Sequence, residues 1–171
     1  MLAKPDLEEE DLQVDDELKM FYCSRTHSQL TQFANEVQKV KLPPVMHTDA
    51  RDEGKDASSP QTEEIKYLSL GSRKNLCINP QVSKLGSATA INERCLELQQ
   101  PKTSREHKCK FLPNKENQPL VNSFRDHTLA RIRDIEDLPA LGKKIGICPY
   151  YASRASIKPS EVTCQTSNIC S

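Results

Sequence analysis

Four cysteines between positions 77 and 148 are the side chains of this sequence best suited to chemistry. They are Cys77, Cys95, Cys109 and Cys148, with 17, 13 and 38 residues between successive members. Cysteine thiolates hold both zinc ions and iron–sulfur clusters. Structural zinc sites usually take two ligands from one Cys-x2-Cys turn, which this chain lacks. The spacing alone therefore leaves a zinc site, an iron–sulfur cluster and ordinary reduced cysteines open.

Charge divides the chain into an acidic first part and a basic second part. Residues 1–64 carry 7 Lys and Arg against 15 Asp and Glu, and residues 65–171 carry 17 against 9, although the formal net charge is zero. All four cysteines lie in the basic part, where a nucleic-acid backbone would be attracted electrostatically. Solvated faces of ordinary helices are the alternative explanation for these charges.

The composition predicts a thin core. Apolar residues make up 36% of the chain, against about 45–50% in ordinary globular proteins. The first residues lack the pattern of a secretion signal, and no apolar run approaches the ~18 residues of a membrane span. We therefore expect a soluble, intracellular chain without a membrane partner, whose cysteines are metal ligands and spectators rather than disulfides.

A strand and a helix are the first elements that the sequence predicts. Residues 1–17 are acidic and are expected to form a flexible leader. The β-prone run 18–23 precedes a polar turn, in which Thr26 and Gln29 fit a capping box that starts a helix reaching about Lys41. Such a turn at the carboxyl end of a strand is where α/β proteins bind phosphates, although first-turn residues are often polar without that function.

The remaining elements surround the cysteines. Residues 42–64 are rich in Pro and acidic residues and predict a disordered insertion, whereas 65–70 predict a second strand. Helices are expected at 87–98, 119–134 and 137–144, with Pro80 interrupting any helix before them. Ala88, Ile91, Cys95 and Leu98 share one face of the first helix, so burial without ligation is the alternative for that cysteine. Cys109 is expected in a Lys-rich loop.

The last part of the sequence gives weaker signals. Pro149 predicts a turn or helix that carries Tyr150, Tyr151 and Arg154, side chains that either stack on single-stranded bases or pack in the core. Residues 159–171 show no periodicity, so we expect no element there and no function for their two cysteines.

Several of these stretches together resemble one family, the XPD-like superfamily 2 DNA helicases that carry an iron–sulfur domain. Residues 22–30 resemble helicase motif Ia, and residues 69–77 resemble the context of the first cluster ligand. Residues 91–95, 108–111 and 140–154 resemble the contexts of the other three ligands. The Ser-Arg-Thr-His and Asn-Glu-Arg-Cys forms are similar to the branch associated with sister-chromatid cohesion.

The resemblance implies an α/β fold with two parts. Residues 18–41 would belong to a partial RecA-like motor domain, and residues 65–158 to an inserted, mostly α-helical iron–sulfur domain. The family's [4Fe–4S] cluster would be held by Cys77, Cys95, Cys109 and Cys148. The expected DNA-binding residues are Ser24, Arg25, Thr26 and His27 of motif Ia, Arg73 and Lys74 beside the first ligand, and Tyr150, Tyr151 and Arg154 beside the fourth.

The function that the resemblance implies is ATP-dependent 5′→3′ unwinding of DNA in the nucleus. Single-stranded or forked DNA would be the partner, in replication, repair and sister-chromatid cohesion, with cohesion or replication-fork proteins as further partners. The sequence contains neither a Gly-x4-Gly-Lys-[Ser/Thr] loop nor an Asp-Glu-Ala-His box, which hold ATP and magnesium in the family. We therefore expect a fragment that is inactive alone, with a truncated or aberrant tail at 159–171. A non-catalytic iron–sulfur or zinc module that binds DNA or acts as a scaffold is the alternative.

Overall fold

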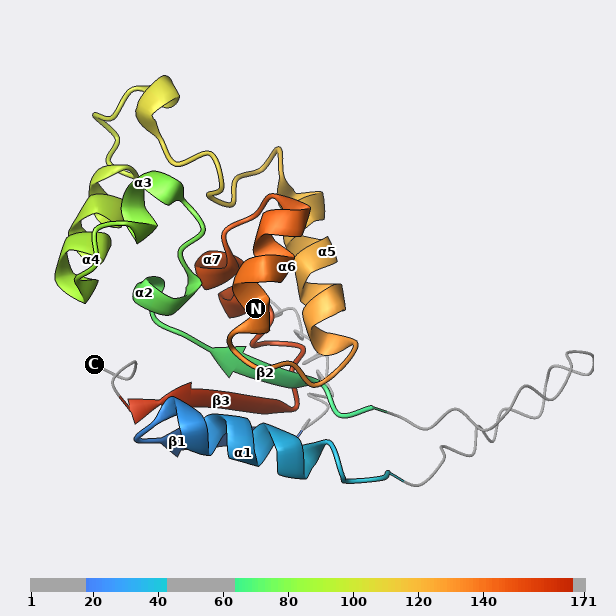
Figure 1. Cartoon of the computed structure of the whole chain (residues 1–171). Coiled ribbons are helices and arrows are strands. Elements are labelled where there is room, and N and C mark those ends of the chain that lie inside the picture. Colours follow the sequence, from blue (N-terminus) through green and yellow to red (C-terminus); the bar gives the residue numbers. More distant parts are fainter. Residues whose placement is uncertain (1–17, 43–63, 168–171) are drawn as a thin grey trace, which may run out of the picture.

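A three-stranded parallel sheet is the centre of the fold in the computed structural model, which describes residues 18–42 and 64–167 (Figure 1). Its strands are β1 (Met20–Ser24), β2 (Tyr67–Leu70) and β3 (Val162–Thr166), in the order β1-β3-β2. Val162 of the central strand is in register with both Met20 and Tyr67. The predicted α/β class is confirmed at this level. The predicted flexible leader and most of the predicted insertion lie outside the described residues.

Helix α1 (His27–Val37) covers one face of the sheet. It begins where the capping box predicts, because the Thr26 hydroxyl accepts a hydrogen bond from the backbone N–H of Gln29 at 3.3 Å. It ends a turn earlier than the sequence predicts. Its buried residues pack against side chains of β2 and β3; this apolar cluster consists of Leu30, Ala34, Val37, Tyr67, Val162 and Cys164.

Three helices form a second layer, against the other face of β2. They are α5 (Gln118–Leu129), α6 (Asp137–Ile145) and α7 (Pro149–Ala155), and α5 and α7 both contact β2. β2 is fully buried although it is an edge strand of the described sheet. Its successive side chains point to opposite faces, and α1 covers one face while α5 and α7 cover the other. The helical core consists of Leu76, Val121, Phe124, Ile135, Leu138, Leu141, Ile147 and Ala152.

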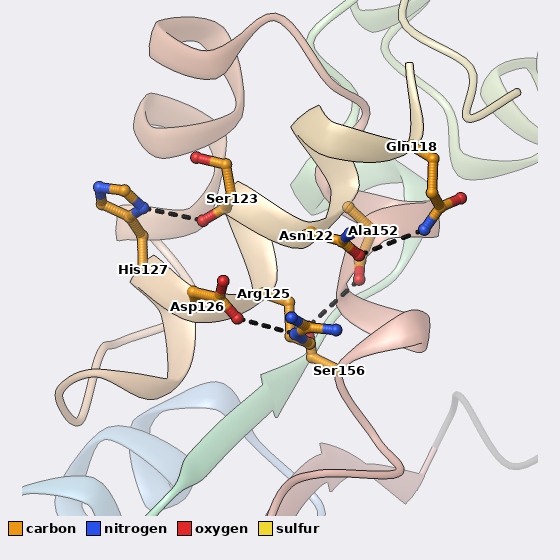
Figure 2. A network of polar contacts seen from close by, with 8 residues as sticks. All are labelled: Gln118, Asn122, Ser123, Arg125, Asp126, His127, Ala152 and Ser156. Atoms are coloured by element: carbon orange, nitrogen blue, oxygen red, sulfur yellow. Dashed lines mark hydrogen bonds and ion pairs between the residues drawn. The ribbon is translucent and has the colours of Figure 1, made fainter. Parts of the chain in front are cut away.

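Polar side chains of α5 and α7 pair locally (Figure 2). Gln118 donates to Asn122 within α5, and the Ser156 hydroxyl, just beyond α7, donates to the Ala152 carbonyl. These contacts span a single helical turn, so they support each helix without fixing how the two helices pack. No helix in the described parts of the chain has the length and apolar character needed to cross a bilayer.

The cysteine-bearing region is built from short helices that extend beyond the carboxyl end of β2 (Figure 1). They are α2 (Arg73–Leu76), α3 (Pro80–Ser83), α4 (Ala88–Glu97) and the 3-10 turn η1 (Arg105–His107). The predicted helix at 87–98 is confirmed, but Ala88 on its expected buried face is exposed. Pro80 does not interrupt a helix as expected; it begins α3, since proline fits the first helical turn.

The central strand is the largest correction to the sequence analysis. Residues 159–171 were expected to contain no element, yet residues 162–165 pair with both other strands and Thr166 pairs with Ser24 of β1. Cys164, expected to carry no function, is fully buried in the cluster beneath α1. The segment that seemed aberrant therefore holds the sheet together.

Candidate metal centre

All four candidate cysteines line one small pocket. Cys77 follows α2, Cys95 lies on α4, Cys109 is in the loop after η1, and Cys148 is the N-cap of α7. The other residues around the pocket are mostly apolar: Ile78, Asn79, Val82, Leu98, Phe111 and Leu112. The fold thus brings together four thiols from four separate elements.

A small apolar cluster holds three of these elements in place. Val82 of α3 packs with Ile91 and Leu98, which lie on α4 and at its end, and all three are almost fully buried. Cys77, Cys95 and Cys109 pack against this cluster from outside. Cys95 is only half-buried, so its sulfur lies at the boundary of the cluster rather than inside it. This geometry is compatible with both alternatives for Cys95, ligation and apolar packing.

A backbone hydrogen bond joins the loop of the third cysteine to the fourth. The N–H of Cys148 donates to the carbonyl of Phe111 at 2.8 Å, two residues after Cys109. At its other end, Cys148 precedes the first turn of α7, where the backbone N–H groups of Tyr150 and Tyr151 face its sulfur. Helix N-terminal N–H groups favour a negatively charged sulfur.

Side-chain amides donate to two of the sulfurs. The Nδ2 of Asn79 lies 3.3 Å from the Sγ of Cys109, and the Nε2 of Gln99 lies 3.3 Å from the Sγ of Cys95. Hydrogen bonds of this kind stabilise negative charge on a ligating sulfur. The sequence analysis missed both amides, although Gln99 lies one helical turn after Cys95 and Asn79 lies two residues after Cys77.

Burial favours the protonated form of two of the thiols, Cys77 and Cys148. It raises the pKa of Cys148 to about 11, against the effect of the N–H groups at the start of α7. Burial also raises the pKa of Cys77, and the neighbouring Cys95 and Cys109 add to that increase. A metal bound here would therefore displace protons, so its affinity would rise with pH.

The donor set fits a thiolate-bound metal group. Four thiols line an apolar pocket, and two of them have amide donors already directed at their sulfurs. Within the described ranges, no three His, Cys, Asp or Glu side chains are gathered closely enough to hold a single ion. The thiols thus share a pocket without converging on one point.

Four of the predicted DNA-binding residues beside the first and fourth cysteines contact one another. The Tyr150 ring has the guanidinium carbon of Arg154 at 3.5 Å and that of Arg73 at 4.3 Å from its centre. Arg73 also donates to the hydroxyl of Tyr151 at 3.0 Å. All four side chains are half-buried. The structure therefore brings these residues together as a packed cluster, whereas Lys74 is exposed.

Motif Ia residues form a polar turn at the carboxyl end of β1. Ser24 is buried, and its hydroxyl donates to the side chain of Gln29 at 2.6 Å. Arg25, Thr26 and His27 are exposed. Because the sheet is parallel, this turn lies at the same edge as the end of β2, and the Nε2 of His27 lies 3.0 Å from the Nδ2 of Asn75 in α2.

Comparison with known proteins supports the resemblance. The sequence profile of the DEAD_2 family matches residues 22–168. The chain is 58% identical over 155 residues to a protein of Aspergillus clavatus named ATP-dependent DNA helicase chl1, covering 91% of this chain and 21% of that protein.

Two further fungal relatives carry the name ATP-dependent DNA helicase CHL1. The match to the Coccidioides immitis protein is 50% identical over 162 residues, 90% of this chain and 19% of that protein. The match to the Sclerotinia sclerotiorum protein is 70% identical over 100 residues, 58% of this chain and 11% of that protein. The chain spans about a fifth of the length of the first curated relatives it matches.

Proposed function

The chain belongs to the DEAD_2 family, and from this premise we propose that it supplies the motif Ia turn and the iron–sulfur centre of an ATP-dependent DNA helicase. The relatives named ATP-dependent DNA helicase support the activity of the whole protein. We propose further that this protein moves 5′→3′ on single-stranded or forked DNA in the nucleus. We propose that it acts in replication, repair and sister-chromatid cohesion. Replication-fork or cohesion proteins would be its partners there.

The observation that carries the proposal is the shared pocket of the four cysteines. Cys77, Cys95, Cys109 and Cys148 are the proposed ligands of a [4Fe–4S] cluster, which the resemblance implies and the all-thiol donor set supports. When bound, such a cluster supplies a covalent cross-link between four elements and a one-electron redox couple. The protein contributes the apolar walls, the amide donors and the helix N-terminus behind Cys148.

The DNA-binding part of the proposal rests on the edge of the sheet where motif Ia and α2 meet. Arg25, Thr26 and His27 present exposed polar and charged side chains there, and Lys74 is exposed on α2. Ser24 orders the turn from inside through its bond to Gln29. We propose that these residues bind the DNA backbone. Arg73, Tyr150, Tyr151 and Arg154 would form the rigid side of this surface, because their contacts with one another hold them in place.

Metal analysis after anaerobic purification tests the proposed centre. We expect a brown protein with about four irons and four acid-labile sulfides per chain, as a [4Fe–4S] cluster requires. A colourless protein with stoichiometric zinc would overturn the iron–sulfur proposal and support the zinc module instead.

ATPase and unwinding assays of the whole protein distinguish a helicase from a non-catalytic module. This sequence contains no phosphate loop, so we expect the chain alone to show no DNA-stimulated ATP hydrolysis. The whole protein, if it is a helicase, should hydrolyse ATP and lose unwinding when Cys95 is replaced. A whole protein that neither hydrolyses ATP nor unwinds DNA would instead support the non-catalytic module.

A further inference from the structure

A continuous chain of hydrogen bonds leads from Arg73 to the sulfur of Cys95. The Nη2 of Arg73 donates to the hydroxyl of Tyr151 at 3.0 Å, and that hydroxyl donates to the Oε1 of Gln99 at 3.0 Å. The Nε2 of Gln99 then donates to the Cys95 sulfur at 3.3 Å. In each of these three hydrogen bonds, the donor lies on the Arg73 side and the acceptor on the Cys95 side.

The orientation of the Gln99 amide is fixed at both of its ends. Its oxygen accepts the Tyr151 proton, while its nitrogen donates to the carbonyl oxygen of Cys95 at 2.7 Å as well as to the sulfur. A reversed amide would place its oxygen against the sulfur and leave the Tyr151 proton without this acceptor. Tyr151 therefore holds the amide in the orientation that directs N–H groups at Cys95.

The charge of Arg73 supports the same arrangement. Burial opposes the charged form of this guanidinium, but the hydrogen bond to Tyr151 and the nearby Tyr150, Tyr151 and Cys95 groups outweigh that effect and raise its pKa. Arg73 therefore keeps its positive charge at the first position of the series of hydrogen bonds that ends at the Cys95 sulfur. Negative charge on that sulfur is thus stabilised through this series of hydrogen bonds.

We propose that Gln99 is a positioning residue for the iron–sulfur centre, and that Tyr151 and Arg73 act through it to set the reduction potential of the cluster bound by Cys95. This inference rests on the proposed function, since it requires the cluster. Reduction adds one electron and so increases negative charge on the ligand sulfurs. Hydrogen bonds to those sulfurs favour the reduced state and raise the potential.

The test is a redox titration of Gln99→Leu, which keeps the side-chain volume and removes the amide. Dithionite supplies one electron per cluster in the presence of mediator dyes, and electron paramagnetic resonance reports the reduced fraction. We expect a lower potential than in the unmodified chain. Gln100→Leu is the matched control, because this adjacent glutamine is exposed, and its potential should be unchanged.

Tyr151→Phe is a second variant in case Gln99→Leu does not retain the cluster. It keeps the ring but removes the hydroxyl that orients Gln99. We expect a smaller shift in the same direction. Iron-loaded Gln99→Leu or Tyr151→Phe protein with the potential of the unmodified chain would overturn the inference while leaving the proposed function intact. An unmodified chain without iron and sulfide would overturn both.

Discussion

His27 and Asn75 meet across the carboxyl edge of the sheet, with their side-chain nitrogens 3.0 Å apart. The first residue begins α1 after the motif Ia turn, and the second lies in α2, two residues before Cys77. Parallel strands bring these two loops to the same edge. The proposed DNA-binding turn and the proposed cluster are therefore connected through one polar contact.

Replacing Asn75 with alanine tests this contact. Because His27 would lose a fixed partner, we expect the affinity for single-stranded DNA to fall about five-fold, the effect of one hydrogen bond worth about 1 kcal/mol. Fluorescence anisotropy of a labelled oligonucleotide measures the affinity, and iron analysis should show an unchanged cluster content. Asn92→Ala, at an exposed position of α4, is the control. Equal affinities for the two variants would show that the contact does not order the motif Ia turn.

Replacing Cys95 with serine should remove the cluster and local folding together. Metal binding and folding are coupled where the ligands come from separate elements, as they do here. We expect the iron content to fall from about four per chain to nearly none. Cys23→Ser is the control, since Cys23 is exposed on β1 and does not line the pocket. Unchanged iron in Cys95→Ser would remove this residue from the ligand set.

Gly142 gives a prediction about how the fourth cysteine is positioned. A Cβ added to this residue of α6 would meet the Pro149 ring and would lie 2.9 Å from the carbonyl oxygen of Ile147. Both neighbours flank Cys148. We expect Gly142→Ala to lower the free energy of unfolding by about 1–3 kcal/mol through overpacking. Denaturant unfolding measures this loss, and Lys143→Ala, at an exposed position, should stay within about 0.5 kcal/mol of the unmodified chain. A Gly142→Ala variant of full stability would mean that α6 and α7 separate at little cost.

The sheet should become less stable in alkaline solution. Burial raises the pKa of Cys164 from its ordinary value of 9.0 to about 11, and it also raises the pKa of Tyr67. Folding thus favours the protonated thiol, a contribution that is complete below pH 9 and is lost as the pH rises toward 11. At about 1.4 kcal/mol for each pH unit, the loss is roughly 2–3 kcal/mol.

Urea midpoints between pH 8 and pH 11 measure this loss. Cys164→Ala should be less stable at pH 8 because of the cavity it leaves, but its stability should fall less steeply with pH. Parallel curves for the variant and the unmodified chain would exclude this thiol as the source.

The start of the fold could be predicted from short patterns. Thr26 and Gln29 predict the first turn of α1 because a capping box is a local interaction, and the structure confirms the hydrogen bond between them. The helix expected at 119–134 is also present as α5, but it ends at Leu129, five residues before the expected end. Ala88 was placed wrongly because helical periodicity identifies a face but not where the packing against it ends.

The central strand could not be recognised from its residues. Buried parallel strands usually read as continuous apolar runs, whereas β3 includes Thr163, Gln165 and Thr166. The structure satisfies one of these through the 2.7 Å bond between the Ser160 and Thr163 hydroxyls. That partner lies outside the strand, so a hydropathy pattern does not reveal it.

The candidate site was only partly visible in the sequence. The four cysteines were found from their contexts, but their shared pocket depends on packing between elements far apart in the chain. Gln99 was missed because its role depends on the position of Tyr151, 52 residues later. The Tyr150 and Tyr151 rings were assigned to DNA, and their contacts with Arg73 could not be foreseen from a linear pattern.

The order of the strands has a consequence for synthesis of the chain. In the described sheet β1 and β2 pair only through β3, which leaves the ribosome after all four pocket cysteines. A nascent chain that has just released Cys148 therefore carries every proposed ligand but no strand pairing between β1 and β2. Because domains form as their residues emerge, loading of the cysteine pocket can precede closure of the sheet. Pairing of residues 162–166 would then join an already organised helical part to the motif Ia strand.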